Sequence, residues 1–433
     1  MAAQKLKRRL ALPLLRPLAI PAVALLWGGL ATSAIGDQLF AVVLSWVAVG
    51  LLGTAAGYLS ALAAATTLAT ALLAGHWADR VEHRRMMIGA DLARAAILLL
   101  LAGAWLLRGS PALWSLIMCV LVLAAGLALF RPAMQAVLPG LVDDMALLPA
   151  ANALLDTTER IARLLGPGLV GLAGAVLPLV HFVTLDAATF IVSAAAVFAI
   201  LRLRPREAPR PARAGHPLTA VLHGFRAVRR HALLGFVLSI SGVLNGAWYA
   251  AYFLGLPLMI AHAGITGPGG TGLAAYGLVI SGYGSTNLLT TLIVGNRAMS
   301  RRPGRVIFTG NLFLGSGIVM LGLAGLAAPA PLLLAAFMGA AALSAIGGPL
   351  QDITVATLRQ TALPRADLPA AVRAFMALNQ AGTLVALAAS PLVFDRLGVA
   401  RGVTLCGAII LVVGAAGLWR HARTEASVSQ APR

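Results

Sequence analysis

The stretch GHWADRVEHRR, residues 75–85, is a short charged segment between two apolar segments that are each long enough to cross a membrane. A weaker copy of it, residues 295–305, follows 220 residues later. Six residues beyond each copy stands a polar residue, Asp91 after the first and Asn311 after the second. A repeated charged hairpin between apolar segments indicates a duplicated membrane bundle, an arrangement more typical of transporters than of enzymes.

The composition predicts an all-α membrane protein. Apolar residues make up 60% of the chain and charged residues 11%, and the mean hydropathy is +0.89. A soluble domain contains about 25% charged residues. Most apolar runs reach about 20 residues, the length that an α-helix needs to cross a bilayer. The low aromatic content of 6% and the lack of an alternating pattern disfavour a β-barrel.

The net charge of +19 does not indicate a nucleic-acid partner, because the basic residues stand in short clusters between apolar segments. No cluster alternates with aromatic residues that could stack on bases. Cys119 and Cys406 each lie within an apolar run and lack the spacing of metal ligands. We therefore expect no metal and no cofactor.

The apolar runs predict twelve transmembrane helices in two six-helix bundles. The first bundle covers residues 1–201 and the second 233–419, joined by a proline-rich cytoplasmic linker, 202–232. Residues 420–433 are expected to form a disordered cytoplasmic tail. The expected helices are 20–46, 53–75, 86–107, 111–131, 153–176, 179–201, 233–260, 273–295, 304–327, 330–350, 369–394 and 401–419.

The basic residues predict the orientation. An even number of spans places both termini on one face, and the alternate loops assign all but three of the 33 basic residues to that face. The three exceptions are Arg108, Arg396 and Arg401. Because basic loops remain in the cytoplasm, both termini are expected to be cytoplasmic.

The charged segment itself suggests a conformational latch. Asp79 can cap the N-terminus of a neighbouring helix, where unpaired N–H groups favour an anion. The arginines beside it can pair with carboxylates, and Asp91 is one candidate partner. The alternative is a solvated basic turn that only sets the topology. The candidate latch comprises Gly75, Asp79, Arg80, Arg84, Arg85 and Asp91.

These motifs resemble those of the major facilitator superfamily. The stretch AGHWADRVEHRRMMIGADLARA, residues 74–95, is similar to the loop signature between its second and third helices, most of all in the bacterial drug and siderophore exporters, which include enterobactin and macrolide exporters. Further similarity lies in Phe130-Arg131-Pro132-Ala133, Val137-Leu138-Pro139, Asn152-Ala153-Leu154 and Ala162-Arg163-Leu164-Leu165-Gly166-Pro167. The resemblance implies alternating access between two pseudo-symmetric bundles in the cytoplasmic membrane of a bacterium. It also implies export in exchange for protons.

The chain departs from the family pattern at three positions. Glu82 replaces a frequent Gly of the loop motif, and Met299 replaces the Asp of the second loop. Ala162 replaces the upstream Gly of the antiporter signature in the fifth helix, so that signature matches only in part.

Asp37 is the strongest candidate for proton coupling. It lies about midway along the first span, where an Asp costs about 2.5–3.5 kcal/mol on insertion scales. Such a carboxyl group can bind and release a proton during exchange; the alternative is a helix-packing Asp that never titrates. Asp186 lies nearer the external end of its span, where water could reach it, and a structural role is the better interpretation.

The fifth span contains candidate gate and hinge residues. We expect Glu159 and Arg163 at its cytoplasmic boundary, with Arg163 acting as a gate. Gly166 and Pro167 interrupt the helix ladder and suggest a hinge. A packing kink without a mechanical role is an equal alternative.

Aromatic and amide residues suggest where a substrate binds. Four of the five tyrosines lie between residues 249 and 283, beside amide and hydroxyl groups that suit an amphipathic ligand. The alternative is an interfacial aromatic belt. The candidate substrate-binding residues are Trp27, Gln38, Asn245, Trp248, Tyr249, Tyr252 and Tyr283.

Nothing in the sequence indicates catalysis. It has no phosphate-binding glycine loop with a Lys and no HExxH motif. We therefore expect a monomeric secondary transporter, not an enzyme, whose partners are the bilayer, protons and a small molecule, either a drug-like compound or a siderophore. Uptake of a nutrient or metabolite, or a non-transporting membrane scaffold, are the alternatives.

Overall fold

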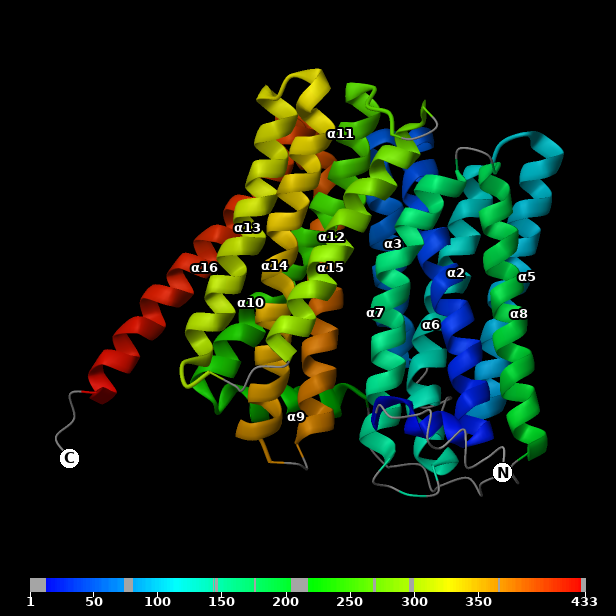
Figure 1. Cartoon of the computed structure of the whole chain (residues 1–433), viewed down its shortest axis with the longest axis horizontal. Helices are drawn as coiled ribbons and strands as arrows, with labels where there is room; N and C mark the ends of the chain where they lie inside the picture. Colours follow the sequence, from blue (N-terminus) through cyan, green and yellow to red (C-terminus); the bar gives the residue numbers. More distant parts are fainter. Residues whose placement is uncertain are drawn as a thin grey trace. The chain divides into compact units, whose positions relative to one another are not determined.

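The computed structural model is all-helical over the residues it describes, and the prediction of an all-α membrane protein is confirmed (Figure 1). The described residues are 13–73, 81–142, 144, 147–174, 177–203, 217–267, 270–295, 300–364 and 367–429. They group into two compact units. Unit 1 comprises Met1–Val43, Thr66–Val170 and Val176–Pro217; unit 2 comprises Leu44–Ala65, Gly171–Ala175 and Leu218–Arg433.

Unit 1 is built mainly from long apolar helices. A short 3-10 helix, η1 (Pro13–Ala19), precedes them. The helices are α2 (Pro21–Leu52), α3 (Ala56–Leu73), α5 (His83–Arg108), α6 (Leu113–Leu141), α7 (Leu148–Ala173) and α8 (Leu179–Leu203). Three helix ends belong to unit 2 instead, namely residues 44–52 of α2, 56–65 of α3 and 171–173 of α7. Helix α5 packs against both α6 and α8.

Unit 2 repeats this plan with longer helices at its end. Its elements are α9 (Pro217–Arg229), α10 (Ala232–Tyr249), the π-helical segment η4 (Ala250–Gly255), α11 (Leu256–Ala263), α12 (Gly272–Gly295), α13 (Pro303–Ala327), α14 (Ala330–Ala362), α15 (Leu368–Leu397) and α16 (Val399–Ser429). Helix α13 packs against α14 and α16, as α5 packs against α6 and α8. Since α13 begins 220 residues after α5, the offset of the charged segments is also the offset of these helices.

The described residues contain ten segments that are long and apolar enough to cross a membrane. The first, Pro21–Leu73, has 53 residues, or about 80 Å of helix at about 1.5 Å per residue. That length exceeds one crossing, and the segment turns at η2 (Gly53–Ala55), where Gly53 has φ +57°. Helix α7 has 26 residues but too many charges to count among the ten. Dividing the first segment and adding α7 gives the expected twelve crossings.

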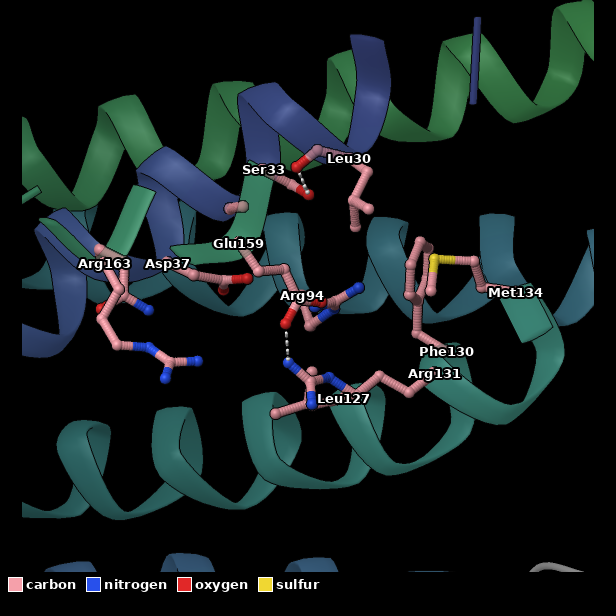
Figure 2. Close-up of a pocket in the computed structure, with 12 residues that line it drawn as sticks. Leu30, Ser33, Asp37, Arg94, Leu127, Phe130, Arg131, Met134, Glu159 and Arg163 are labelled. Carbon is pink, nitrogen blue, oxygen red and sulfur yellow. Dashed lines mark hydrogen bonds and ion pairs between the residues drawn. The ribbon is translucent and has the colours of Figure 1, made fainter. Parts of the chain in front are cut away.

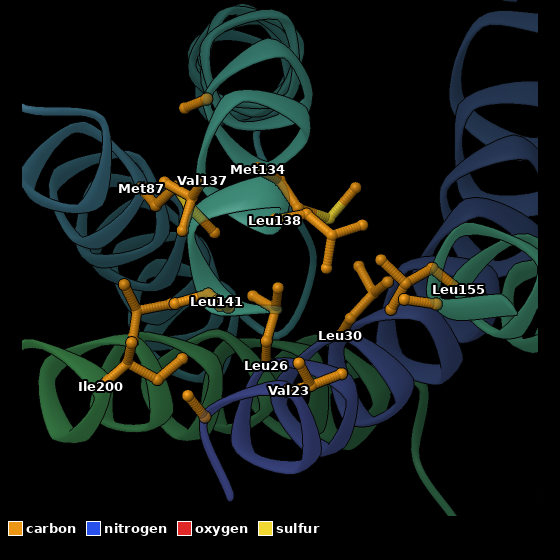
Figure 3. Packing of buried hydrophobic residues seen from close by; sticks show 14 of the residues in the cluster. Val23, Leu26, Leu30, Met87, Met134, Val137, Leu138, Leu141, Leu155 and Ile200 are labelled. Carbon is orange, nitrogen blue, oxygen red and sulfur yellow. The ribbon is translucent and has the colours of Figure 1, made fainter. Parts of the chain in front are cut away.

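Each unit has its own apolar core. In unit 1, α2, α5, α6, α7 and α8 contribute buried residues that include Leu26, Met87, Leu138 and Leu155 (Figure 3). In unit 2, the corresponding core includes Val237 and Phe308. Large apolar side chains also lie on the outside of the helices, with Leu107 90% exposed, as expected of surfaces that face lipid.

Two parts of the chain differ from the sequence-based expectation. The expected linker contains helix α9, whose Val228 is fully buried against unit 2. The expected disordered tail is wrong for residues 420–429, because α16 continues to Ser429. Proline-rich and polar composition alone did not reveal that α9 has an apolar stripe, or that no helix-breaking residue stands between Arg420 and Ser429.

Candidate functional site

Charged side chains gather halfway along the helices of unit 1. We call seven of them the charged cluster, and five helices supply them. They are Asp37 of α2, Asp91 and Arg94 of α5, Arg131 of α6, Glu159 and Arg163 of α7, and Asp186 of α8. Glu159 and Arg163 were expected at the cytoplasmic boundary. Because α7 begins at Leu148, five residues earlier than expected, they lie near its middle instead.

Five members of the charged cluster line a small open hollow in unit 1 (Figure 2). They are Asp37, Arg94, Arg131, Glu159 and Arg163. The remaining lining residues are Leu30, Ser33, Ala34, Gln38, Leu127, Phe130 and Met134. The hollow is therefore apolar toward one side and charged toward the other.

Arg94 and Asp91 form an ion pair in the interior, one helical turn apart on α5. Arg94 is 3% exposed and Asp91 0%. The guanidinium also lies over the rings of Phe130 and Phe190, 4.9 Å and 4.2 Å from their centroids. The ion pair and the two aromatic rings together stabilise a positive charge in an apolar interior.

A second ion pair joins two helices at the hollow. Arg131 Nη2 of α6 lies 2.8 Å from Glu159 Oε2 of α7. The Arg131 side chain is 50% exposed, so water screens this pair much more than the pair of Arg94.

Asp37 and Arg163 share the hollow without a bonded partner. Neither side chain makes a hydrogen bond or ion pair with any residue that the structure describes. The charges of Arg94, Arg131 and Glu159 act on the Asp37 carboxyl group. Asp37 is partly exposed to the hollow, so that a proton or a ligand can reach it.

The charge of the cluster does not balance. Four carboxyl groups face three guanidinium groups, which leaves one excess negative charge when all are ionised. An uncompensated charge in an apolar interior is costly, so the cluster favours binding one proton or one cationic group. This is the chemistry that a coupling site for protons requires.

The predicted residues around Gly166 lie at the contact between α7 and α2. A Cβ atom at Gly166 would overlap the Cβ of Gln38, so the glycine permits close approach of the two helices. Trp27 donates a hydrogen bond of 2.8 Å from Nε1 to Thr158 Oγ1, which also joins α2 to α7. Pro167 lies one residue further along α7.

Four of the aromatic residues predicted for substrate binding, Trp248, Tyr249, Tyr252 and Tyr283, form one cluster in unit 2. Trp248 lies 4.9 Å from Tyr249, 5.8 Å from Tyr252 and 5.9 Å from Tyr283, measured between ring centroids. Asn245 donates to Thr383 Oγ1 at 2.7 Å and so joins α10 to α15. Tyr252 is fully buried, whereas Trp248, Tyr249 and Tyr283 are partly exposed.

The cluster adjoins an irregular stretch of backbone. Residues 250–255 form the π-helix η4, which contains Tyr252. Such π-helical turns shift the register of side chains and are frequent at functional sites. No sequence signal distinguishes η4 from the α-helix around it.

Only part of the predicted latch can be placed. Gly75, Asp79 and Arg80 lie outside the described residues, as does Met299. Arg85 pairs with Glu82 of its own turn at 3.2 Å, and Arg84 is buried. Asp91 pairs with Arg94 of its own helix rather than with a loop arginine.

Sequence reasoning missed Arg94 and Arg131, and it expected water to reach Asp186, which is 0% exposed. The spacing of Asp91 and Arg94, three residues apart on one helix face, was a signal that could have identified their pair. Asp186 is buried because α2 packs against it at Gly36, and no local sequence pattern predicts this helix contact.

Comparisons with known proteins agree with this architecture. The chain resembles the POT family transporter PepTSo at 11% identity, covering 94% of this chain and 98% of that one, with a TM-score of 0.72. It resembles an auto-inhibited POT family peptide transporter at 14% identity, covering 93% and 96%, with a TM-score of 0.69. It also resembles a bacterial homologue of the iron transporter ferroportin in its inward-facing state, at 14% identity over 92% and 98%, with a TM-score of 0.65. Identities this low show the fold alone.

No protein of curated function matches the sequence. The family model of the Major Facilitator Superfamily, in contrast, matches residues 26–321, about two thirds of the chain. This match spans the charged cluster of unit 1 and the aromatic cluster of unit 2. The protein is thus a multi-pass membrane transporter, not an enzyme, and the chain belongs to the Major Facilitator Superfamily.

Proposed function

We propose that this transporter exports a small amphipathic molecule, a drug-like compound or a siderophore, in exchange for protons. The observation that carries the proposal is the charged cluster, whose single excess negative charge lies in the middle of apolar helices. The resemblance of residues 74–95 to the bacterial exporters supports the direction of transport. The partial match around Gly166 and Pro167 supports antiport.

Exchange follows if substrate and proton bind to different charge states of the cluster. Asp37 is the carboxyl group that the hollow exposes and that no residue among those described neutralises through an ion pair. Binding of a proton there changes the charge of the cluster by one. A substrate that binds only the deprotonated state then cannot travel together with the proton, which is the condition for antiport.

The aromatic cluster of unit 2 is the proposed binding surface for the apolar part of the substrate. Trp248, Tyr249 and Tyr283 offer partly exposed ring faces, and Asn245 adds an amide group. Within unit 1, Trp27 and Gln38 stay predicted substrate-binding residues. The residues of the loop signature, Gly75 to Arg85 with Asp91, are the proposed latch between conformations.

We further propose that the protein acts as a monomer in the cytoplasmic membrane of a bacterium, with both termini in the cytoplasm. The distribution of arginines supports this orientation. Fusion of a reporter that fluoresces only in the cytoplasm to residue 433 tests it. A fusion protein that is produced but does not fluoresce would overturn the proposed orientation.

The second candidate is uptake of a nutrient or metabolite. Solved structures that share the fold include an auto-inhibited POT family peptide transporter and a POT family transporter in complex with 5-aminolevulinic acid. The first-half motifs favour export over this candidate. A scaffold without transport is disfavoured by the charged cluster, since charged groups in the middle of a membrane are expensive and are a default indication of function.

Transport into inside-out vesicles separates these candidates. Fluorescent amphipathic dyes such as ethidium and Hoechst 33342 serve as probes, with the pH gradient imposed in either direction. Antiport export predicts accumulation only when the lumen is acidic, because protons leaving the lumen drive the dye inward. Proton-coupled uptake predicts the opposite gradient, and a scaffold predicts no accumulation with either.

Asp37→Asn tests the coupling role within the same assay. We expect gradient-driven accumulation to fall by about tenfold or more. Asp156→Asn is the matched control, since Asp156 is an exposed Asp of α7 outside the hollow. Wild-type accumulation by Asp37→Asn would remove Asp37 from the coupling role.

A further inference from the structure

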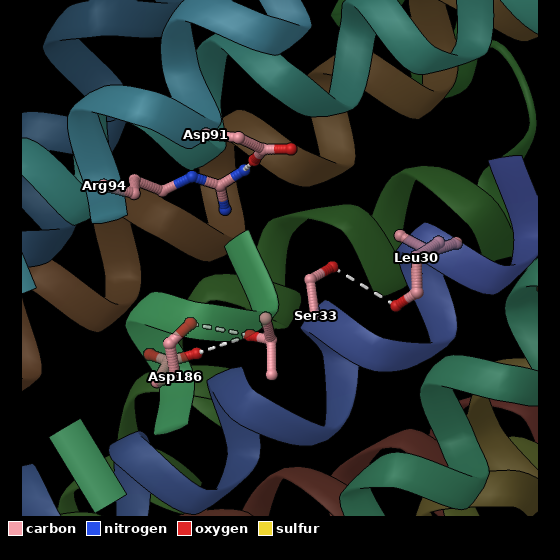
Figure 4. A network of polar contacts seen from close by, with 6 residues as sticks. Leu30, Ser33, Asp91, Arg94 and Asp186 are labelled. Atoms are coloured by element: carbon pink, nitrogen blue, oxygen red, sulfur yellow. Dashed lines mark hydrogen bonds and ion pairs between the residues drawn. The ribbon is translucent and has the colours of Figure 1, made fainter. Parts of the chain in front are cut away.

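The carboxyl group of Asp186 is enclosed and only partly satisfied. It is 0% exposed, and its Oδ2 has no hydrogen-bond partner among the described residues. The Thr189 hydroxyl lies 2.7 Å from the Asp186 carbonyl oxygen and 3.3 Å from its Oδ1, and it has one hydrogen to donate. No cation forms an ion pair with Asp186 in the part of the chain that the structure describes (Figure 4). An ionised carboxylate is therefore poorly stabilised at this position.

Helix α2 lies directly against Asp186. A Cβ atom at Gly36 would overlap Asp186 Oδ1 and Thr189 Oγ1. Two helical turns earlier, a Cβ atom at Gly29 would lie 3.2 Å from the Cα atom of Ser193. The two glycines thus let the α2 backbone approach α8 closely, as small residues do in membrane bundles. This contact places Asp37, the neighbour of Gly36, beside α8.

Few ionisable groups face Asp186, and none neutralises it. Helix α2 presents Asp37, α5 presents Arg94, and α6 presents the Cys119 thiol. Arg94 is already paired with Asp91 inside the helix bundle. Among the described residues, neither Asp37 nor Asp186 forms an ion pair, and ionising both in this interior is unfavourable.

We propose that Asp186 is a second proton-binding residue and that Asp37 and Asp186 share one proton across the contact at Gly36. Asp37 exchanges the proton with the hollow, and Asp186 holds it where water does not reach. The inference rests on the proposed proton coupling. It adds Asp186, which would otherwise have only a structural role, to the proton-binding residues. It also predicts that the pair exchanges one proton.

Infrared difference spectroscopy after pH jumps tests this pair without any substrate, because the probe is the proton itself. The purified protein in lipid is titrated while the carbonyl band of protonated carboxyl groups is followed. We expect the midpoint of this band to move by about one pH unit in Asp37→Asn and in Asp186→Asn, since each removes half of a coupled pair. The double variant should lose the part of the band that this pair contributes, and Asp186→Glu should titrate more like wild type than Asp186→Asn does.

Thr189→Val provides a second test if Asp186→Asn does not fold. It keeps the shape of the side chain but removes the hydroxyl that lies 3.3 Å from Oδ1, so the midpoint should move, whereas a purely structural Asp186 predicts no change. A titration of Asp186→Asn or Thr189→Val identical to wild type overturns the proposal. If dye accumulation in wild-type vesicles did not depend on the pH gradient, the proposed antiport would be overturned instead. The infrared titration would still show whether Asp37 and Asp186 share a proton.

Discussion

Helices α5 of unit 1 and α13 of unit 2 occupy equivalent places in the repeat, yet their interiors differ. The buried pair Asp91–Arg94 of α5 corresponds, 220 residues later, to Asn311 and Leu314 of α13. Asn311 is 0% exposed, and neither its Nδ2 nor its Oδ1 has a hydrogen-bond partner among the described residues. The same fold therefore carries an ion pair in one half and an uncharged pair in the other.

This difference extends to α10, α11 and α12 of unit 2. The helices of unit 1 hold the charged cluster, whereas residues 232–295 of unit 2 contain no Asp, Glu, Lys or Arg. Their polar groups are amides, hydroxyls and aromatic rings. The comparison teaches that duplication preserves packing but not chemistry. Proton coupling can be concentrated in one half and contact with the ligand in the other.

The largest expected effect on stability comes from removing the charge of Arg94, whose counterpart in unit 2 is the uncharged Leu314. Arg94→Met leaves Asp91 buried and unpaired, which should cost about 3–5 kcal/mol of unfolding free energy. The double variant Asp91→Asn/Arg94→Leu copies the pair of α13 into α5 and should recover most of this loss. Unfolding in detergent, followed by temperature or denaturant, measures both.

The control for this pair is Arg85→Ala. Arg85 is 58% exposed in its pair with Glu82, so its loss should cost less than about 1 kcal/mol. If Arg94→Met lowered the unfolding free energy by no more than Arg85→Ala does, the interior pair would not stabilise unit 1. If the double variant stayed as unstable as Arg94→Met, the two halves would not be interchangeable at this position.

A smaller effect is expected where α2 meets α8. Gly36→Ala places a methyl group against Asp186 and Thr189, and such overpacking costs about 1–3 kcal/mol. Gly28→Ala is the matched control on the same helix, because a Cβ atom there meets nothing within 4 Å. The two unfolding free energies should differ by at least about 1 kcal/mol. Equal values would place α2 farther from α8 than the structure has it.

In unit 2 the expected change is in ligand affinity and not in coupling. Trp248→Ala removes a ring that contacts three other rings of the aromatic cluster, and aromatic contacts contribute about 0.5–1.5 kcal/mol each. The apparent affinity for a transported dye should fall several-fold, while the dependence of transport on the pH gradient stays that of wild type. An altered pH dependence would contradict the division of roles between the units.

The sequence predicted the parts of this architecture that repeat or that follow from hydropathy. Apolar runs located the helices, and the position of Asp37 in the middle of its run identified it as a coupling candidate. The charged segments predicted the relation between α5 and α13. These signals are local, so one sequence suffices to read them.

What the sequence could not predict depends on contacts between helices. Arg94 belongs to the site because Phe130 and Phe190, on two other helices, cover its guanidinium. Asp186 became part of the cluster because Gly36 lets α2 approach it. The tail was mistaken for disorder because polar composition does not exclude a helix. The errors at Arg94 and Asp186 concern partners far away in the chain, which periodicity does not reveal.

The smallest effect on stability is expected at the pair Arg131–Glu159. It is half-exposed at the hollow, so Glu159→Gln should change the unfolding free energy by only about 0.2–1 kcal/mol. The same substitution removes the excess negative charge of the cluster, and we expect the infrared titration of the Asp37–Asp186 pair to move. Arg131→Gln changes the charge in the opposite sense and should move the midpoint the other way. A variant pair with unchanged stability and opposite shifts would show that the charge of unit 1, not its packing, sets the proton site. Shifts in the same direction would show that the ion pair acts by holding α6 against α7. The net charge of the cluster would then not determine proton binding.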